Sequence, residues 1–351
     1  MKQNRLLVLL ITSAAACAPI ATAYAQCACD FNNDGFRDGT DLAFINANFG
    51  NQNGVGDCTG DGFTDGADST RLLSGWGACP TPTWATVLEW KVNAAIVTDS
   101  TLRSAIYAID LPWRVLDTGT GIEMLLIPPD LFTMGCSPSD LYTGCPGDEN
   151  PTHAVTLTNA FYLGRYEVTQ EQWMTRVGSN PSHFVGYADS PSRPVEKVSW
   201  DMIANFNTMT GLRLPTEAKW EYAYRAQMGT EPLVTRTAFH NGNDDALLGN
   251  IAWYNVNSEI HTHAVGGKLA NALGLHDMSG NVFEWVNDWY GSTYYSSSFS
   301  TNPTGPSSGE QRVVRGGGWF SWAHQCRASE RFAHASNRGY YDRGFRSARN
   351  P

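Results

Sequence analysis

One acidic pattern occurs twice near the start of this chain, and it restricts what that part can fold into. The first copy spans Asp30–Asp41 and the second spans Asp57–Asp68. Both copies carry oxygen-bearing side chains at loop positions 1, 3, 5, 9 and 12, with Gly35 or Gly62 at position 6, where the chain turns sharply. A hard cation needs about six to eight oxygen ligands, and this spacing supplies them from one short loop. We therefore expect two calcium sites, and the alternative is a pair of Asp-, Asn- and Gly-rich turns without metal.

The predicted ligands are side-chain oxygens and, at loop position 7, the backbone carbonyl of a phenylalanine. They are Asp30, Asn32, Asp34, Phe36, Asp38 and Asp41 in the first loop and Asp57, Thr59, Asp61, Phe63, Asp65 and Asp68 in the second. One helical stretch follows each loop, over Leu42–Phe49 and Ser69–Trp76. This arrangement resembles a dockerin from Cys29 to about Gly77. The resemblance implies a small EF-hand-like calcium domain over residues 26–80 and a cohesin-like surface protein as its partner.

Loop positions 10 and 11, which help dockerins choose their cohesin, depart from the family pattern. They are Gly39-Thr40 and Gly66-Ala67, which are small and nearly the same in both copies. A calcium-stiffened stalk that has no cohesin partner therefore stays open as an alternative. So small a domain has little core, and we expect metal and disulfides to supply stability.

The first residues are typical of an exported protein. A basic start precedes the short apolar stretch Leu6–Ala18, and Ala23-Tyr24-Ala25 offers a cleavage site, so residues 1–25 are predicted to be a secretory signal peptide. A lipoprotein anchor at Cys17 is the alternative. No later stretch is apolar for the roughly 20 residues that a membrane helix needs. We expect a secreted or cell-surface protein without a membrane span.

Seven cysteines follow the predicted signal peptide, and an oxidising compartment favours their pairing. We expect the first four to pair among themselves; these are Cys27, Cys29, Cys58 and Cys79. Cys136 and Cys145 bracket one short polar loop and are predicted to form a disulfide. Cys326 is then unpaired, and a buried, inert cysteine is commoner than a reactive one.

The net charge of −10 argues against nucleic acid as a partner, because the sequence has no basic stripe that could neutralise phosphates.

Pro80-Thr-Pro-Thr83 is predicted to be a short stiff linker. Residues 81–121 form the linker and the edge of a large domain, with a helix over Ser100–Ile109. The large domain spans residues 122–351. Its expected elements are strands over Ile122–Ile127, Ala154–Leu157 and Tyr162–Val168, and helices that begin at Thr169, Ser199 and Thr216. The helix that begins at Ser199 is expected to end at Gly211.

Six motifs in the large domain occur in the order that is found in the formylglycine-generating enzyme (sulfatase-modifying factor) family. They are Phe161–Thr169, Pro194–Trp200, Arg213–Tyr222, Gly280–Trp285, Arg315–Trp319 and Gly344–Arg346. The chain resembles this family from Ile122 to its C-terminus. The resemblance implies an α+β fold of the C-type-lectin-like kind, with little regular structure, buried tryptophans and bound calcium.

The same resemblance implies two further calcium sites. One takes Asp277, the carbonyls of Gly280 and Val282, and Glu284, whereas Glu284 paired with an arginine is the alternative reading. The other site begins at Asn250-Ile251, and only that pair carries over, because the segment with the later ligands is shorter here.

The family's enzymes bind copper(I) through two cysteines five residues apart. By alignment these positions are Ser321 and Cys326, while the oxygen-holding serine falls on Gly318 and a neighbouring histidine falls on Trp322. Because a hydroxyl cannot replace a thiolate toward copper(I), the sequence argues against a copper site and against the family's oxidase chemistry. Cys326, the one catalytic candidate, is then a remnant or a packing residue.

We therefore expect a binding module, in which aromatic and amide side chains recognise a glycan, a peptide or a surface partner. The predicted ligand-binding surface consists of Phe320, Trp322, His324, Gln325, Tyr340 and Tyr341. These rings could instead belong to the core. Two other functions stay open: an oxidase that acts on a cysteine of exported sulfatases, and dockerin-mediated assembly of a surface or polysaccharide-degrading complex. His261 and His263 have no third ligand in evidence and are expected to lie in a surface loop.

Overall fold

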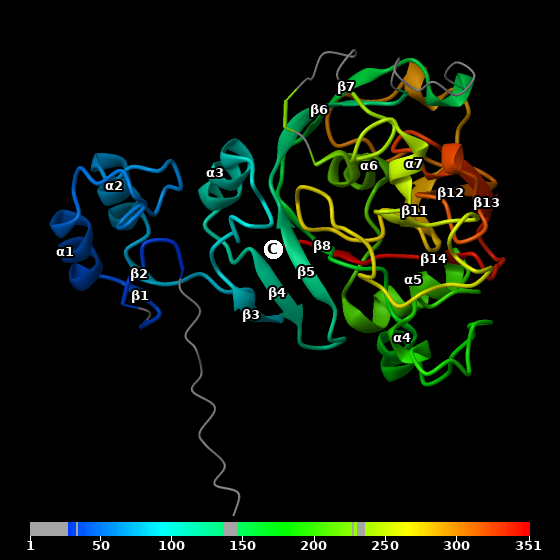
Figure 1. Cartoon of the computed structure of the whole chain (residues 1–351), viewed down its shortest axis with the longest axis horizontal. Coiled ribbons are helices and arrows are strands. Elements are labelled where there is room, and N and C mark those ends of the chain that lie inside the picture. Colours follow the sequence, from blue (N-terminus) through cyan, green and yellow to red (C-terminus); the bar gives the residue numbers. More distant parts are fainter. Residues whose placement is uncertain (1–26, 33, 137–145, 227, 230–235) are drawn as a thin grey trace, which may run out of the picture.

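The computed structural model describes residues 27–32, 34–136, 146–226, 228–229 and 236–351. The predicted signal peptide and Cys145 lie outside these residues. Figure 1 shows a small N-terminal module beside a larger domain, with the helix α3 (Ser100–Ala108) on the side of the large domain that faces the module. No helix in the described residues is long and apolar enough to cross a membrane.

The N-terminal module contains two short helices and a two-stranded sheet. The helices are α1 (Gly39–Ala47) and α2 (Gly66–Ser74), and the strands β1 (Phe36–Arg37) and β2 (Gly77–Ala78) pair antiparallel. Both helices begin earlier than predicted. The reason is that Asp38 and Asp65, expected only as ligands, are N-caps, and each forms a capping box with the aspartate at loop position 12.

Two disulfides hold this module together. Cys27 pairs with Cys79 and Cys29 pairs with Cys58, so the expectation that the four N-terminal cysteines pair among themselves is confirmed. The module's buried apolar cluster is small and includes Ile45 and Leu72 packed with Cys29 and Cys58. The two disulfides therefore supply much of the stability that a hydrophobic core would supply in a larger domain. Cys136 is also disulfide-bonded, but its predicted partner Cys145 lies outside the described residues.

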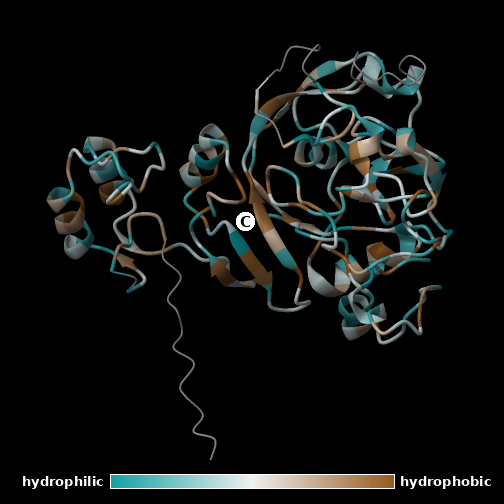
Figure 2. Cartoon of the chain, viewed as in Figure 1, coloured by the Kyte–Doolittle hydropathy of each residue, from teal (hydrophilic) through white to brown (hydrophobic). Residues whose placement is uncertain are grey.

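A five-stranded antiparallel sheet forms one side of the large domain. Its strands, in spatial order, are β15 (Ala348–Arg349), β8 (Phe161–Gly164), β5 (Glu123–Ile127), β4 (Arg114–Asp117) and β3 (Ala85–Glu89). Residues 81–121 therefore contribute two strands of the sheet as well as the linker. Figure 2 shows apolar residues along β3, β4 and β5. The predicted strand over Tyr162–Val168 is shorter than expected, because the chain leaves the sheet after Gly164.

A four-stranded sheet contains parts of three of the six family-like motifs. Its order is β13 (Phe332–Ala335), β12 (Gln311–Arg315), β11 (Phe283–Trp289) and β14 (Arg343–Gly344). A hairpin of β6 (Asp130–Met134) and β7 (His153–Leu157) and a parallel pair of β9 (Ala252–Trp253) and β10 (Ser279–Gly280) complete the strands.

The three predicted helices of the large domain are confirmed, together with their predicted starts and the one predicted end, at Gly211. Thr169 and Gln172 form a capping box at α4 (Gln170–Val177). Ser199 caps α5 (Trp200–Thr210), which ends at Gly211 in a left-handed conformation. Thr216 caps α6 (Glu217–Arg225). The remaining helical pieces are short: α7 (Asp245–Leu248) and the 3-10 turns η1 (Gly147–Glu149), η2 (Ser190–Ser192), η4 (Tyr294–Ser296) and η5 (Ala323–Cys326).

One large hydrophobic core lies between the two sheets and the helices, and it includes the buried indoles of Trp113, Trp173, Trp220 and Trp285. A second, smaller core contains Cys326 and residues of the 238–254 segment. The N-terminal module contacts the large domain through Asp110, whose carboxylate lies 2.6 Å from Arg37 Nη1 and 3.7 Å from Arg71 Nη2.

Candidate functional site

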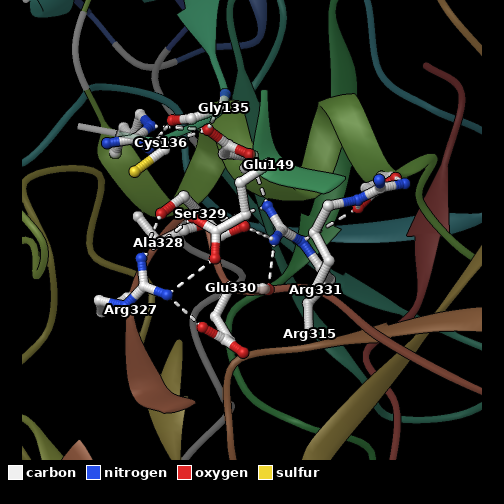
Figure 3. Close-up of polar contacts among 12 residues, drawn as sticks. Gly135, Cys136, Glu149, Arg315, Arg327, Ala328, Ser329, Glu330 and Arg331 are labelled. Atoms are coloured by element: carbon white, nitrogen blue, oxygen red, sulfur yellow. Dashed lines mark hydrogen bonds and ion pairs between the residues drawn. The ribbon is translucent and has the colours of Figure 1, made fainter. Parts of the chain in front are cut away.

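A buried ion-pair network fixes the segment in which the family's catalytic positions fall. Arg315 lies 2.5 Å from Glu221 of α6, and Arg331 lies 2.6 Å from Glu217 of the same helix. Arg327 reaches Glu149 of η1 at 2.7 Å. Figure 3 shows Arg327 between the carboxylates of Glu149 and Glu330, and Arg315 beside the backbone carbonyls of Ala328, Ser329 and Glu330. Breaking a buried pair of this kind costs roughly 3–5 kcal/mol, so the network holds residues 315–331 in one conformation.

The thiol of Cys326 is buried in this rigid segment. Cys326 has no exposed surface, and it is the one free cysteine among the described residues. Burial, and to a smaller extent Glu330, raise the pKa of this thiol. A Cβ added at Gly317 would lie 2.7 Å from the sulfur, so the backbone packs closely against it. A thiol with a raised pKa and no access to solvent behaves as a small apolar core residue.

Ser321, at the position of the other family cysteine, has a local structural role. Its hydroxyl oxygen accepts a hydrogen bond from the backbone N–H of Gly318 at 2.9 Å, and its own N–H donates to the Gly318 carbonyl at 2.9 Å. The side chain is buried, with an exposed fraction of 4%. The hydroxyl therefore closes the tight turn that presents Phe320 to solvent.

Aromatic side chains from four segments converge around the buried indole of Trp319. Phe184 packs edge-on against Trp319 with ring centroids 5.3 Å apart, and Phe320 and Tyr341 lie 5.4 and 6.1 Å from it. The Trp319 indole N–H also donates to the carbonyl of Tyr341 at 3.0 Å. His183 lies 5.8 Å from the Tyr341 ring, so residues 183–184, 319–320 and 341 form one cluster.

The fourth segment extends this cluster through His261. Its ring lies 6.5 Å from Phe184 and 5.2 Å from Tyr187, and the Arg193 guanidinium lies 3.8 Å above the Tyr187 ring. We call the solvent-facing part of this group the aromatic surface; it comprises Tyr187, His183, His261, Phe320 and Tyr341. Phe320 is 65% exposed and Tyr341 is 53% exposed, so both rings present apolar surface to solvent within this group.

The structure separates the six residues that the sequence predicted as a ligand-binding surface. Phe320 and Tyr341 belong to the aromatic surface, whereas Tyr340 packs against His334 and the Arg343 guanidinium. Trp322, His324 and Gln325 lie at the start of η5, where the Gln325 side chain accepts the Trp322 backbone N–H at 2.9 Å. Trp322 is 64% exposed.

Sequence reasoning missed His183, Phe184 and Tyr187, because they lie in a loop far along the chain from residues 319–341. The one available signal was the density of aromatic residues in that loop. His261, by contrast, was expected in a surface loop, and the structure places it there.

A second group of buried charges surrounds the predicted family calcium position. Both oxygens of Glu284 are bonded: Arg346 approaches them at 2.5 and 2.6 Å, and Trp220 donates its indole N–H at 2.7 Å. The arginine-paired alternative is therefore the geometry observed for Glu284. Glu167, which sequence reasoning did not single out, accepts the Val282 N–H at 3.0 Å and the Asn281 side chain at 2.6 Å.

Asp277 is the member of this group that fits a cation. Its Oδ2 accepts the Gly266 N–H at 2.6 Å, but its buried Oδ1 has no hydrogen-bond partner. Burial raises the pKa of Asp277 to about 6, and burial with the charges of Asp277 and Glu284 raises that of Glu167. An unbonded buried carboxylate oxygen beside a second carboxylate fits a hard cation. Gly280 and Val282 lie within the same stretch, between Asp277 and Glu284.

The second predicted calcium site of the large domain, which begins at Asn250-Ile251, has backbone and lysine contacts around it. The Asn250 carbonyl accepts the backbone N–H of Leu269 at 3.0 Å, and the Ile251 side chain is buried in the smaller core. The Lys268 ammonium donates to the neighbouring carbonyl of Gly249 at 2.6 Å. The ammonium of Lys268 therefore places a positive charge beside the predicted ligands Asn250 and Ile251.

The two acidic loops of the N-terminal module have the same internal hydrogen bonds. In the first loop Asp30 Oδ2 accepts the Gly35 N–H at 3.0 Å, and in the second Asp57 Oδ2 accepts the Gly62 N–H at 2.8 Å. Asp41 and Asp68, at position 12, are completely buried. Gly35 and Gly62 adopt φ values of 87° and 94°, as the sharp turn at position 6 requires.

The carboxylates of these loops are not gathered into one compact cluster. Among the described residues, one trio of His, Cys, Asp or Glu has ligand atoms within 4.8 Å of one another, and it consists of Cys27, Asp30 and Cys79. The two cysteines are joined in a disulfide, so this trio does not fit a metal site. The two loops share their turn glycines and internal hydrogen bonds, and their metal binding stays a prediction.

Comparisons with known proteins agree with this arrangement. A model of the sulfatase-modifying factor enzyme 1-like domain matches residues 116–351. The chaperone protein LppX of Paenibacillus barcinonensis is 33% identical over 216 residues, which cover 48% of this chain and 71% of that protein. The formylglycine-generating enzyme of Bos taurus is 30% identical over 282 residues, which cover 64% of this chain and 74% of the enzyme.

A solved structure shows the same fold. The Treponema denticola variable protein 1 is 30% identical, with a TM-score of 0.57, and the match covers 66% of this chain and 95% of that protein. Some other curated relatives are covered less completely, and for one of them this chain spans 35% of the protein's own length. The match to the domain model extends over more than half of the chain and includes the ion-pair network, Ser321, Cys326 and the aromatic surface. The chain belongs to the sulfatase-modifying factor enzyme 1-like family.

Proposed function

We propose that this protein is a binding module that acts outside the cell and recognises a glycan or protein ligand through the aromatic surface. The observation that carries the proposal is the contrast between two neighbouring groups on one rigid segment. The thiol of Cys326 is completely buried, whereas the ring of Phe320, six residues earlier, is 65% exposed. The segment from Phe320 to Cys326 therefore exposes an apolar ring to solvent, while its thiol stays buried.

Two features support the loss of copper chemistry. The position of one family cysteine is Ser321, whose hydroxyl already accepts the Gly318 N–H. The remaining thiol is buried, and its raised pKa disfavours the thiolate that binds copper(I). The donor set does not fit copper(I), and we derive no oxidase step for this chain.

The names of the relatives indicate that proteins of this family have more than one function. One is named a chaperone and another a formylglycine-generating enzyme, although both are similar to this chain at comparable identity. Family membership alone therefore does not decide the activity. The two disulfides fit an extracellular protein, as the proposal requires.

A glycan array and a displayed-peptide library, each probed with the full chain, test the binding function. We expect at least one ligand whose binding is lost in a Phe320→Ser, Tyr341→Ser variant. Phe299→Ser is the matched control, because Phe299 is 75% exposed and is not part of the aromatic surface. Binding that is equal in both variants would contradict the assignment of the surface, and an absence of ligands in both libraries would contradict the recognition function.

Calcium binding by the two N-terminal loops is a second proposal, supported by the matching hydrogen bonds and turn glycines of the loops. Each loop carries four aspartates, and a bound cation would offset their negative charge. We expect chelator to lower the unfolding temperature of the full chain, and calcium to restore it where equal magnesium does not. An Asp34→Asn, Asp61→Asn variant should lose the response. A variant that responds like the parent would place the calcium effect elsewhere, for example at Asp277.

A further inference from the structure

A cavity of about 580 Å³ lies on the large domain, at the junction of four segments. It shares no residue with the aromatic surface or with the acidic loops. The segments are the turn before β8, the first turn of α6, the loop that follows η4, and the end of β15. The lining residues are Asn159, Ala160, Thr216, Lys219, Asn302, Thr304, Asn350 and Pro351.

The positive charge of Lys219 is not neutralised within this cavity. The ammonium is held 4.9 Å from the ring centroid of Phe161, which is itself buried. No carboxylate in the described residues lies within ion-pair distance of Lys219, although the chain has a net charge of −10. A half-buried lysine without a counter-ion is costly unless an anion supplies one.

A second cation strengthens the positive field of the cavity. Arg213, one turn before α6, donates to the Asn350 side-chain oxygen at 2.9 Å and has no carboxylate partner in the described part of the chain. Burial and the charge of Arg213 together lower the pKa of Lys219 to about 8. The two cations repel each other, and a shared anion would relieve that repulsion.

The rest of the lining combines amide and hydroxyl side chains with Ala160 and Pro351. The Asn302 side chain is held in place by Thr158, since its oxygen accepts the Thr158 N–H at 3.1 Å and its nitrogen donates to the Thr158 hydroxyl at 2.7 Å. Thr216 and Thr304 add hydroxyl groups, and the amide nitrogen of Asn350 can donate. Among the described residues no aromatic side chain lines the cavity, so a nucleotide base would find no ring there to stack on. The lining suits a ligand that carries several hydroxyl groups.

We propose that this cavity binds an anionic saccharide, with its carboxylate or sulfate group on Lys219 and its hydroxyl groups on the asparagine and threonine side chains. The volume is large enough for a sugar with one negative group, and ligand pockets begin at about 300 Å³. The acidic group of a uronic acid and the ester of a sulfated sugar share the chemistry that the site recognises, and the experiment distinguishes them.

Isothermal titration of the full chain tests the proposal with four probes: D-glucuronate, glucose 6-sulfate, glucose and acetate. We expect at least one of the two anionic sugars to bind, and to bind about tenfold or more tightly than glucose or acetate, because charged and neutral contacts act together. Glucuronate alone would identify a uronic acid site, and glucose 6-sulfate alone would identify a sulfated-sugar site. Acetate binding that equals the sugars would overturn the saccharide assignment, and an absence of binding by both anionic sugars would overturn the proposal.

Two variants assign the binding to this cavity. Lys219→Met should weaken it about tenfold or more, whereas Lys268→Met should leave it unchanged. Lys268 is a suitable control, since it also lies over an aromatic ring, that of Trp253, and is absent from the cavity lining. Thr304→Glu, on the exposed rim, should weaken binding by repulsion and guards against a folding defect in the lysine variant. Equal binding by the parent, Lys219→Met and Thr304→Glu would contradict the proposal.

Discussion

The buried carboxylate of Glu196 accepts the backbone N–H of Phe184 at 2.8 Å. It also accepts the N–H of His183 at 2.5 Å, so one side chain holds the loop that supplies two rings to the aromatic cluster. Its other oxygen is buried without a hydrogen-bond partner. Burial raises the pKa of Glu196 to about 7, despite these two backbone contacts.

Glu196 should therefore make stability depend on pH. Between the unfolded pKa of about 4.3 and the folded pKa of about 7, the folded protein holds a proton that the unfolded chain has released. Its contribution to stability is thus present below the unfolded pKa and is lost as the pH rises through 7. We expect Glu196→Gln to remove up to about 3 kcal/mol of this decline between pH 5 and pH 8. Urea unfolding at several pH values measures it, with the exposed Glu171→Gln as control; identical pH profiles for the parent and Glu196→Gln would contradict the prediction.

Arg315 should be a major contributor to the stability of the large domain. It is completely buried, and its removal leaves Glu221 with less compensating charge. We expect Arg315→Met to lower the free energy of unfolding by about 3 kcal/mol. The exposed Arg338→Gln should change it by less than about 0.5 kcal/mol. Chemical denaturation compares the two, and equal effects would show that the network does not stabilise the fold.

Cys326 should resist alkylation in the folded protein. Its thiol is buried and its pKa is raised, so both access and thiolate formation are disfavoured. We expect iodoacetamide to leave Cys326 unmodified under native conditions and to modify it fully in denaturant, as peptide mass spectrometry would show. Rapid modification of the native protein would contradict the packing role.

Asp110 should fix the N-terminal module against the large domain. It lies between Arg37 and Arg71 at 2.6 and 3.7 Å, and these partly exposed pairs contribute about 1 kcal/mol or less each. We expect Asp110→Asn to increase the rate at which a protease cuts within residues 80–84, while the large domain unfolds as before. An unchanged cleavage rate would show that the pairing does not restrain the module.

The sequence predicted the local elements well because their signals are local. Thr169 with Gln172, Ser199 with Gly211, and Thr216 each occur at a helix end where a capping residue was expected. The pairing of the four N-terminal cysteines among themselves followed from their separation from the others. These features depend on residues within a few positions of one another or on the composition of one segment.

The aromatic surface could not be predicted as a whole, because irregular chain brings its parts together. No periodic pattern links Tyr187 and His261 to Phe320. Tyr340 was predicted to belong to the surface because it is aromatic, whereas its ring lies 5.5 Å from that of His334. The sequence also could not show that Lys219 lacks an ion-pair partner, because ion pairing depends on which carboxylates the fold brings near the ammonium.

The central claim is that this chain binds a ligand and does not oxidise a cysteine. The most direct test supplies copper(I) and oxygen to the full chain together with a sulfatase-type Cys-x-Pro-x-Arg peptide, and follows the peptide by mass spectrometry. We predict an unchanged peptide mass, because Cys326 is buried and Ser321 offers a hydroxyl where the family's enzymes have a second thiolate. A loss of mass that matches conversion of the thiol to an aldehyde would contradict the account.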